Sequence, residues 1–272
     1  KEHIFLGCHA QWITPESVGE QLPYYDSERQ MVITADAIID NRDELFDLLQ
    51  VEPSTRKTMP DSQLILLAYC KWGENSPKYL IGDFAFIIWD EREQQLFGAR
   101  DISGYRTLYY YKHKYTYGLC TTIEPLLTMP NIYKSLNEEW LAEYLSITGL
   151  IDTVDALSTP YQQINQVPPS HSILVKDNKI SLCKYGSLYS KQNLKLKSSN
   201  EYVEAFQDVF QQAVNSKLRT NKAIGAQLSG GLDSGSVVGF AAKTLKAQNK
   251  MGQLHTFSYI PPTDFEDHTH KR

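Results

Sequence analysis

The sequence predicts a mixed α+β front part that is followed by the start of an α/β part with a parallel sheet. Up to about residue 185, strand-like runs and hairpin signals alternate with a few helical segments. From residue 201 a long amphipathic helix, a strand, a glycine turn, a helix and a strand follow in that order, which is typical of a βαβ unit. The Ser-, Lys- and Asn-rich stretch 187–200 is interpreted as a linker, so we expect domains at 1–186 and 201–272.

The strands of the front part are predicted from short runs of β-branched, aromatic and aliphatic residues. We expect strands at 31–36 and 96–101, and a hairpin with arms at 107–111 and 115–120. The run 82–91 is apolar without interruption until it reaches a turn, which predicts a strand buried on both faces.

Two short helices are predicted between these strands. Residues 43–50 follow Asp40 and Asn41, and either of these could cap the helix. Residues 63–72 carry apolar side chains at helical spacing and follow Asp61, which we expect to be the N-cap.

The rear part is expected to begin with a helix at 201–217, whose apolar side chains keep helical spacing. A strand at 223–228, a helix at 233–247 and a strand at 254–260 follow. The glycine turn lies between the first strand and the second helix.

Composition excludes several classes of function. The net charge is -5, which argues against a nucleic-acid partner, and no apolar run reaches the roughly 20 residues that span a membrane. Four widely spaced cysteines, none in a Cys-x-x-Cys motif, predict reduced and mostly buried thiols in a cytoplasmic protein, with Cys8 in the core. Neither end resembles a natural terminus, so we interpret the sequence as a piece of a longer protein.

A glycine turn between a strand and a helix carries the clearest chemical signal. Such a turn points backbone N–H groups at a ligand from the positive end of the helix dipole, and therefore binds anions. Glycines let a phosphate approach closely, two serine hydroxyls add donors, and Asp233 fits if Mg²⁺ lies between its carboxylate and the phosphate. An ordinary glycine-rich turn is the alternative. The expected binding residues are Leu228, Ser229, Gly230, Gly231, Leu232, Asp233 and Ser234.

The string Ser229-Gly-Gly-Leu-Asp-Ser234 resembles the pyrophosphate-binding signature of the N-type ATP pyrophosphatases. The resemblance implies ATP and Mg²⁺ as ligands, an adenine nucleotide α-hydrolase-like parallel sheet, and attack of a carboxylate on the α-phosphorus to give an adenylate and pyrophosphate. It also implies that Ser258, after the second strand, contacts the adenine or the ribose.

Strings ahead of that turn resemble the asparagine synthetase (glutamine-hydrolysing) family. The longest is Leu80-Ile-Gly-Asp-Phe-Ala-Phe-Ile-Ile-Trp-Asp90, and shorter ones lie at 60–66, 72–73, 99–104, 107–110, 167–171 and 184–185. The resemblance covers nearly all of the chain. It implies an N-terminal-nucleophile-type glutaminase sandwich, a class II amidotransferase domain, ahead of a synthetase domain whose catalytic residues are expected outside this sequence.

Several positions depart from the family's glutamine site. The family's nucleophile is an N-terminal Cys, and Cys8 is internal. Asp36, Ala37 and Ile38 replace the Asn-Gly-Glu that supplies oxyanion and ammonium contacts, and the arginine expected near residues 7–11 is missing. Asp61 alone survives, so the resemblance implies a vestigial glutamine site at Asp36, Ala37, Ile38 and Asp61.

These losses leave the substrate open. In the parent family aspartate becomes asparagine, whereas the lasso-peptide cyclase branch adenylates a peptide carboxylate that the peptide's own amine attacks without any glutaminase. The front domain as a peptide-binding module is a further alternative. We therefore expect a small-molecule or peptide carboxylate as partner, with no nucleic acid and no membrane, and leave a homodimer open.

Overall fold

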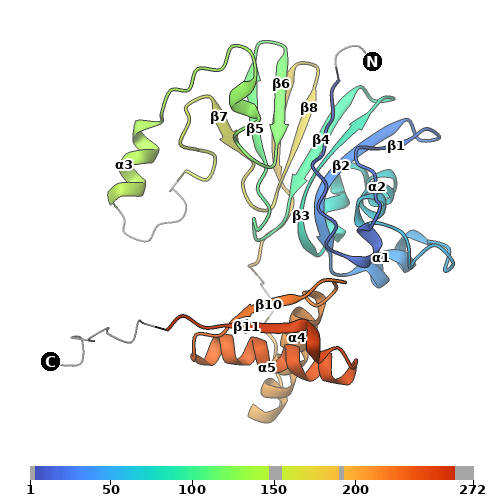
Figure 1. Ribbon diagram of the computed structural model, residues 1–272. Coiled ribbons are helices and arrows are strands. Elements are labelled where there is room, and N and C mark those ends of the chain that lie inside the picture. The colour runs from blue at the N-terminus through green and yellow to red at the C-terminus, as the bar shows by residue number, and fades with distance from the viewer. Residues whose placement is uncertain (1–3, 147–154, 190–192, 261–272) are drawn as a thin grey trace. The chain divides into compact units, whose positions relative to one another are not determined.

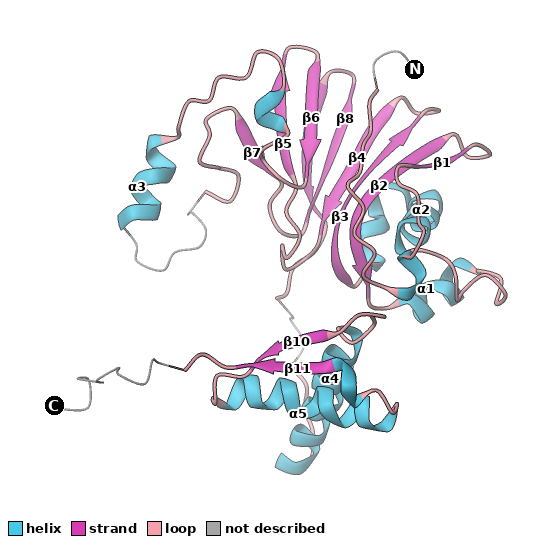
Figure 2. Cartoon of the chain, viewed as in Figure 1, coloured by secondary structure: helices cyan, strands magenta, loops and turns pink. Residues whose placement is uncertain are grey.

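The computed structural model describes residues 4–146, 155–189 and 193–260. The chain divides into two compact units, one of residues 1–12 with 16–193 and the other of residues 13–15 with 194–272. Figures 1 and 2 show the elements of each unit.

The front unit is built on two antiparallel sheets (Figure 1). The larger sheet has the strand order β1-β2-β3-β4-β8-β9, and the smaller has the order β6-β5-β7. The larger sheet consists of β1 (Tyr24–Asp26), β2 (Met31–Ile39), β3 (Gly82–Asp90), β4 (Gln95–Arg100), β8 (His171–Lys176) and β9 (Lys179–Lys184). The smaller sheet consists of β5 (Tyr109–His113), β6 (Thr116–Cys120) and β7 (Ile164–Gln166).

Helices flank these strands. They are α1 (Arg42–Leu49), α2 (Asp61–Trp72) and α3 (Glu138–Ser146), together with the 3-10 turns η1 (Pro15–Ser17), η2 (Gly73–Tyr79) and η3 (Leu126–Thr128). The rear unit contains α4 (Ser199–Ser216), β10 (Ile224–Gln227), α5 (Leu232–Ala247), η4 (Met251–Gln253) and β11 (Leu254–Phe257). In the described part of the chain, no helix is long and apolar enough to cross a membrane.

Strand β3 separates two hydrophobic cores, because successive side chains of a strand point to opposite faces. Phe84, Phe86 and Ile88 pack in one core with buried residues of α1 and α2. Ala85 and Ile87 pack in the other with residues of the smaller sheet's strands and loops. The prediction of a strand buried on both faces is confirmed, and the layers run from helices to larger sheet to smaller sheet.

The tight start of β3 requires glycine. Gly82 has φ +148° and pairs with Ile39 of β2. A Cβ at this position would meet the carbonyl oxygen of Ile38 at 2.2 Å, so any side chain would force the two strands apart.

Other expectations for the front unit need correction. The hairpin β8–β9 was not predicted, although Asp177 and Asn178 both adopt positive φ and form its turn. Asn41 occupies the N-cap position of α1, but its side chain does not cap; its oxygen accepts from the amide of Ile81 at 2.9 Å. The four cysteines are free, as expected, but Cys8, Cys70 and Cys183 are exposed, so the prediction that Cys8 lies in the core is wrong.

The rear unit confirms the predicted βαβ unit. Strands β10 and β11 pair in parallel, with Ile224 opposite Leu254, and α5 connects them. Helix α4 packs on α5 through an edge-to-face contact of Phe210 and Phe240, whose ring centroids are 5.1 Å apart. Strand β11 ends at Phe257, three residues earlier than expected.

Candidate nucleotide and glutamine sites

The turn between β10 and α5 has the geometry of an anion site. Gly230 adopts φ +82°, and α5 begins at Leu232 after the N-cap Gly231. The first intrahelical bond runs from the amide of Gly235 to the carbonyl of Gly231 at 3.1 Å. The amides ahead of Gly235 in this first turn therefore have no intrahelical acceptor and are available to an anion.

Two serine hydroxyls organise this turn from inside. The hydroxyls of Ser229 and Ser234 are 2.9 Å apart and share a hydrogen bond. The amide of Ser229 also donates to the Ser234 hydroxyl at 3.2 Å, and the amide of Gly231 donates to the Ser229 hydroxyl at 3.4 Å. The structure thus brings the hydroxyls of Ser229 and Ser234, the two predicted donors, into direct contact.

Asp233 lies exposed in the first turn of α5, beside these amides. A single carboxylate next to a phosphate site fits Mg²⁺, which is usually held by one or two carboxylates together with phosphate oxygens and water. Leu232 is 86% exposed, so it does not anchor the turn by packing. Ser258 follows β11, and its hydroxyl donates to the carbonyl of Leu228 at 2.6 Å.

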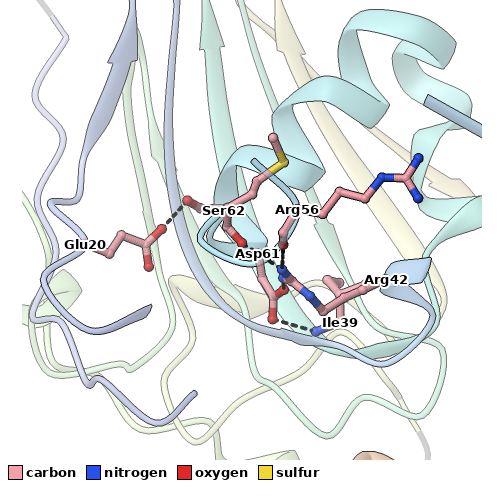
Figure 3. Close-up of polar contacts among 7 residues, drawn as sticks. Glu20, Ile39, Arg42, Arg56, Asp61 and Ser62 are labelled. Atoms are coloured by element: carbon pink, nitrogen blue, oxygen red, sulfur yellow. Dashed lines mark hydrogen bonds and ion pairs between the residues drawn. The ribbon is translucent and has the colours of Figure 1, made fainter. Parts of the chain in front are cut away.

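Asp61 is not the N-cap of α2, and the capping prediction is wrong. Pro60 occupies the cap position, and Asp61 is the first helical residue. Its carboxylate pairs with the guanidinium of Arg42 and accepts from the amide of Ile39 at 2.9 Å (Figure 3). The side chains of both charged partners are less than a tenth exposed.

Arg42 is fully engaged around this carboxylate. Its guanidinium donates to the carbonyls of Met59 at 2.8 Å and Arg56 at 3.2 Å (Figure 3). It also lies over the ring of Phe46, 5.0 Å from the centroid. Asp61 and Arg42 therefore neutralise each other and fix the segment between α1 and α2.

A second acid stands beside this pair. The hydroxyl of Ser62 donates to the carboxylate of Glu20 (Figure 3). Burial raises the pKa of Glu20, the Ser62 hydrogen bond opposes that effect, and the nearby charge of Asp61 adds to it. Glu20 is therefore a second, partly buried carboxyl group close to Asp61.

The three replaced positions of the family motif lie on β2. Asp36, Ala37 and Ile38 pair with Ala85, Phe84 and Asp83 of β3. The carboxylate of Asp36 lies 3.4 Å from the guanidinium of Arg106. Burial raises the pKa of Asp36, Arg106 opposes the rise, and the like charge of Asp83 supports it. Sequence reasoning did not find Arg106.

Asp101 positions Arg106 from the end of β4. Its carboxylate accepts from the amides of Tyr105 at 2.9 Å and Arg106 at 2.8 Å, and from the hydroxyl of Ser103 at 2.7 Å. Arg100 holds the same loop by donating to the carbonyl of Arg106 at 2.6 Å. The loop that carries Arg106 is therefore fixed by two buried charged side chains.

The carboxylates of Asp36 and Asp61 each pair with an arginine of the front unit. Asp36 faces Arg106, and Asp61 is buried against Arg42. Arg42 was missed because its partner is 19 residues away in the sequence. Its position directly before the acidic start of α1 was the only local signal.

We expect Asp61→Asn to destabilise the front unit by about 3–5 kcal/mol, because it leaves the buried Arg42 without a counterion. Urea unfolding of the protein measures the change. Replacing both partners together, as Arg42→Met with Asp61→Leu, should recover much of the loss.

The exposed pair of Lys176 and Glu93 is the matched control. There, Glu93→Gln should cost no more than about 1 kcal/mol. Equal effects of Asp61→Asn and Glu93→Gln would contradict a buried, mutually dependent pair.

Comparisons with known proteins give a family match for each of the two parts of the chain. Residues 6–186 match the family model described as a glutamine amidotransferase domain, and residues 205–270 match the one described as asparagine synthase. The first match and the layered sheets confirm the predicted N-terminal-nucleophile-type sandwich.

The relatives are distant. Asparagine synthetase (glutamine-hydrolyzing) 3 of Bacillus subtilis is 27% identical over 218 residues, which are 80% of this chain and 34% of that protein. Amidase chry2 of Gibberella zeae is 29% identical over 71% of this chain and 28% of that protein. A solved structure of glutamine phosphoribosylpyrophosphate amidotransferase from B. subtilis with ADP and GMP is 14% identical, with a TM-score of 0.40 over 81% of this chain and 46% of that one. The chain spans about a third of the length of the curated relatives it matches.

Proposed function

We propose that the protein is an ATP-dependent amide ligase, from the premise that the chain belongs to the asparagine synthetase (glutamine-hydrolysing) family. The observation that carries the proposal is the glycine turn at 228–234, which leaves amides at the start of α5 open to an anion. In the proposal this turn holds the β- and γ-phosphates of ATP, and Asp233 is the protein ligand of Mg²⁺. When bound, Mg²⁺ supplies positive charge that neutralises phosphate oxygens beside a carboxylate.

The reaction that we propose is adenylation followed by amide formation. A carboxylate oxygen of the substrate attacks the α-phosphorus of ATP, the bond to the β-phosphate bridging oxygen breaks, and pyrophosphate leaves. An amine then attacks the acyl carbon of the adenylate, and AMP leaves with the bonding electrons. The turn of this chain supports the first step because it grips the leaving pyrophosphate, whose developing charge the amides stabilise.

The amine is the part of the reaction in which this chain departs from its parent family. We infer that the front unit does not release ammonia from glutamine. Asp36 places a carboxylate where an oxyanion would need a donor, and Ile38 cannot pair with an ammonium group. Asp61, the acid that the resemblance retains, is buried against Arg42.

Two substrates remain within the proposal. Aspartate with free ammonia would give asparagine. A peptide whose own amine attacks its adenylated side chain would give an isopeptide bond, as in the lasso-peptide cyclases. The ion pairs of Asp36 and Asp61 favour the peptide substrate. A peptide that supplies its own amine does not need ammonia from glutamine.

We expect Asp233→Ala to weaken Mg-ATP binding by about 1.5–3 kcal/mol, since it removes a charged ligand of Mg²⁺. Ser234→Ala should weaken it by about 0.5–1.5 kcal/mol, since it removes the hydrogen bonds that hold Ser229 in the turn. Calorimetry on the full-length protein measures the change. Asp208→Ala on α4 and Ser236→Ala in the next turn of α5 are the matched controls. Unchanged affinity in both loop variants would reduce the turn to an ordinary strand–helix connection.

We expect ATP to be cleaved between the α- and β-phosphates. Labelled pyrophosphate should exchange into ATP only when the carboxylate substrate is present, because exchange requires a reversible adenylate. Product analysis by chromatography should show AMP. Accumulation of ADP without AMP would rule out adenylation.

We expect no glutaminase activity from the full-length protein in a coupled glutamate-release assay. Loss of one oxyanion donor typically lowers turnover by roughly 10²–10³, and the charge anchors of the substrate are lost as well. Asp36→Asn with Ile38→Glu should not restore activity, because Arg42 still holds Asp61. Steady glutamate release that a covalent glutamine-site inhibitor abolishes would return the protein to glutamine-dependent synthesis.

A further inference from the structure

The hydroxyl of Ser258 joins the end of β11 to the start of the nucleotide turn. It donates to the carbonyl of Leu228 at 2.6 Å, and the amide of Leu228 donates to the carbonyl of Phe257 at 2.8 Å. Both backbone polar groups of Leu228 are therefore held by two consecutive residues of the neighbouring chain segment. The parallel pairing of β10 and β11 ends at Gln227 and Phe257, so Ser258 extends the connection beyond the ladder with a side chain.

The turn has a second anchor at its other end. The backbone amide and the hydroxyl of Ser229 both hydrogen-bond to the hydroxyl of Ser234 in the first turn of α5. Residues 228 and 229 are thus tied to β11 on one side and to α5 on the other. The next residues, Gly230 and Gly231, bridge the gap to the helix.

These anchors act where packing supplies none. A Cβ built on Gly230 would meet no atom within 4 Å, and Gly231 is exposed. Glycine loses more conformational freedom on ordering than any other residue, so an unanchored glycine turn would have to be ordered by its ligand. A turn that is already held in place binds more tightly, because this ordering is complete before the ligand arrives.

We infer that Ser258 is a positioning residue for the phosphate-binding turn and acts through the carbonyl of Leu228, which differs from the direct contact to adenine or ribose that the sequence led us to expect. The inference rests on the proposed function. A serine hydroxyl has one hydrogen to donate, and that hydrogen is engaged by Leu228 at 2.6 Å. While the turn keeps this geometry, the hydroxyl can offer a nucleoside only its lone pairs, and the contact that its hydrogen makes is the one to the turn.

The two roles are separated by a ligand that has phosphates but no nucleoside. Calorimetry on the full-length protein compares Mg-ATP with inorganic tripolyphosphate in the presence of Mg²⁺. We expect Ser258→Ala to weaken both ligands by the same factor, about 2- to 10-fold, as for the loss of one neutral hydrogen bond. Ser258→Thr should keep the affinity for both. Thr256→Ala, which removes an exposed hydroxyl two residues earlier, in β11, should leave both affinities unchanged.

A variant that folds poorly does not decide the question, so an isosteric pair accompanies it. Ser258→Thr and Ser258→Val differ only in the hydroxyl, and thermal unfolding verifies that both are folded. If Ser258→Val binds both ligands more weakly than Ser258→Thr does, the positioning role stands. If the loss is confined to Mg-ATP, Ser258 contacts the nucleoside and the inference is overturned.

The remaining outcomes separate this inference from the proposed function. Tight binding of both ligands by every variant overturns the role of Ser258 and leaves the nucleotide turn intact. Failure of the unaltered protein to bind either ligand overturns the proposed function, and the inference with it.

Discussion

The front unit depends on how a buried carboxylate is neutralised. Asp61 is 6% exposed at the start of α2, where an unpaired charge would be strongly unfavourable. Arg42 supplies the cation, and its remaining donors bind the carbonyls of Met59 and Arg56. The pair thereby fixes α1, α2 and the segment between them under one face of the larger sheet.

The rear unit follows the opposite rule. Its important groups are the first backbone amides of α5, which have no acceptor within the helix because no helical turn precedes them. Serine side chains hold the turn in shape without covering those amides, since Ser229 bonds Ser234 and Ser258 bonds Leu228. In the front unit the buried Asp61 carboxylate is satisfied internally, whereas in the rear unit the first amides of α5 have no acceptor within the helix.

Local patterns in the sequence were enough to predict the strand β3 and the βαβ unit. An uninterrupted apolar run and a strand–glycine–helix order depend on neighbours along the chain, and both were confirmed. Asp61 was misread because an acid ahead of an apolar helix matches a cap, whereas its partner Arg42 comes from another helix. Arg106 meets Asp36 across 70 positions, which no local pattern encodes. Cys8 was placed in the core from residue type alone, and its segment is exposed.

The ion pairs of Asp36 and Asp61 also mean that single substitutions at these sites disturb existing contacts. An asparagine at position 36 would supply an oxyanion donor but would leave Arg106 without the carboxylate that now faces it. Freeing Asp61 would require removal of Arg42, which leaves a buried acid and two carbonyls without their donor. The Asp61 pair is buried, so its disruption should cost far more stability than disruption of the partly exposed Asp36 pair. The nucleotide turn carries no such constraint, since its anchors lie within 194–272. The contacts that hold this turn are therefore separate from those that hold Asp36 and Asp61.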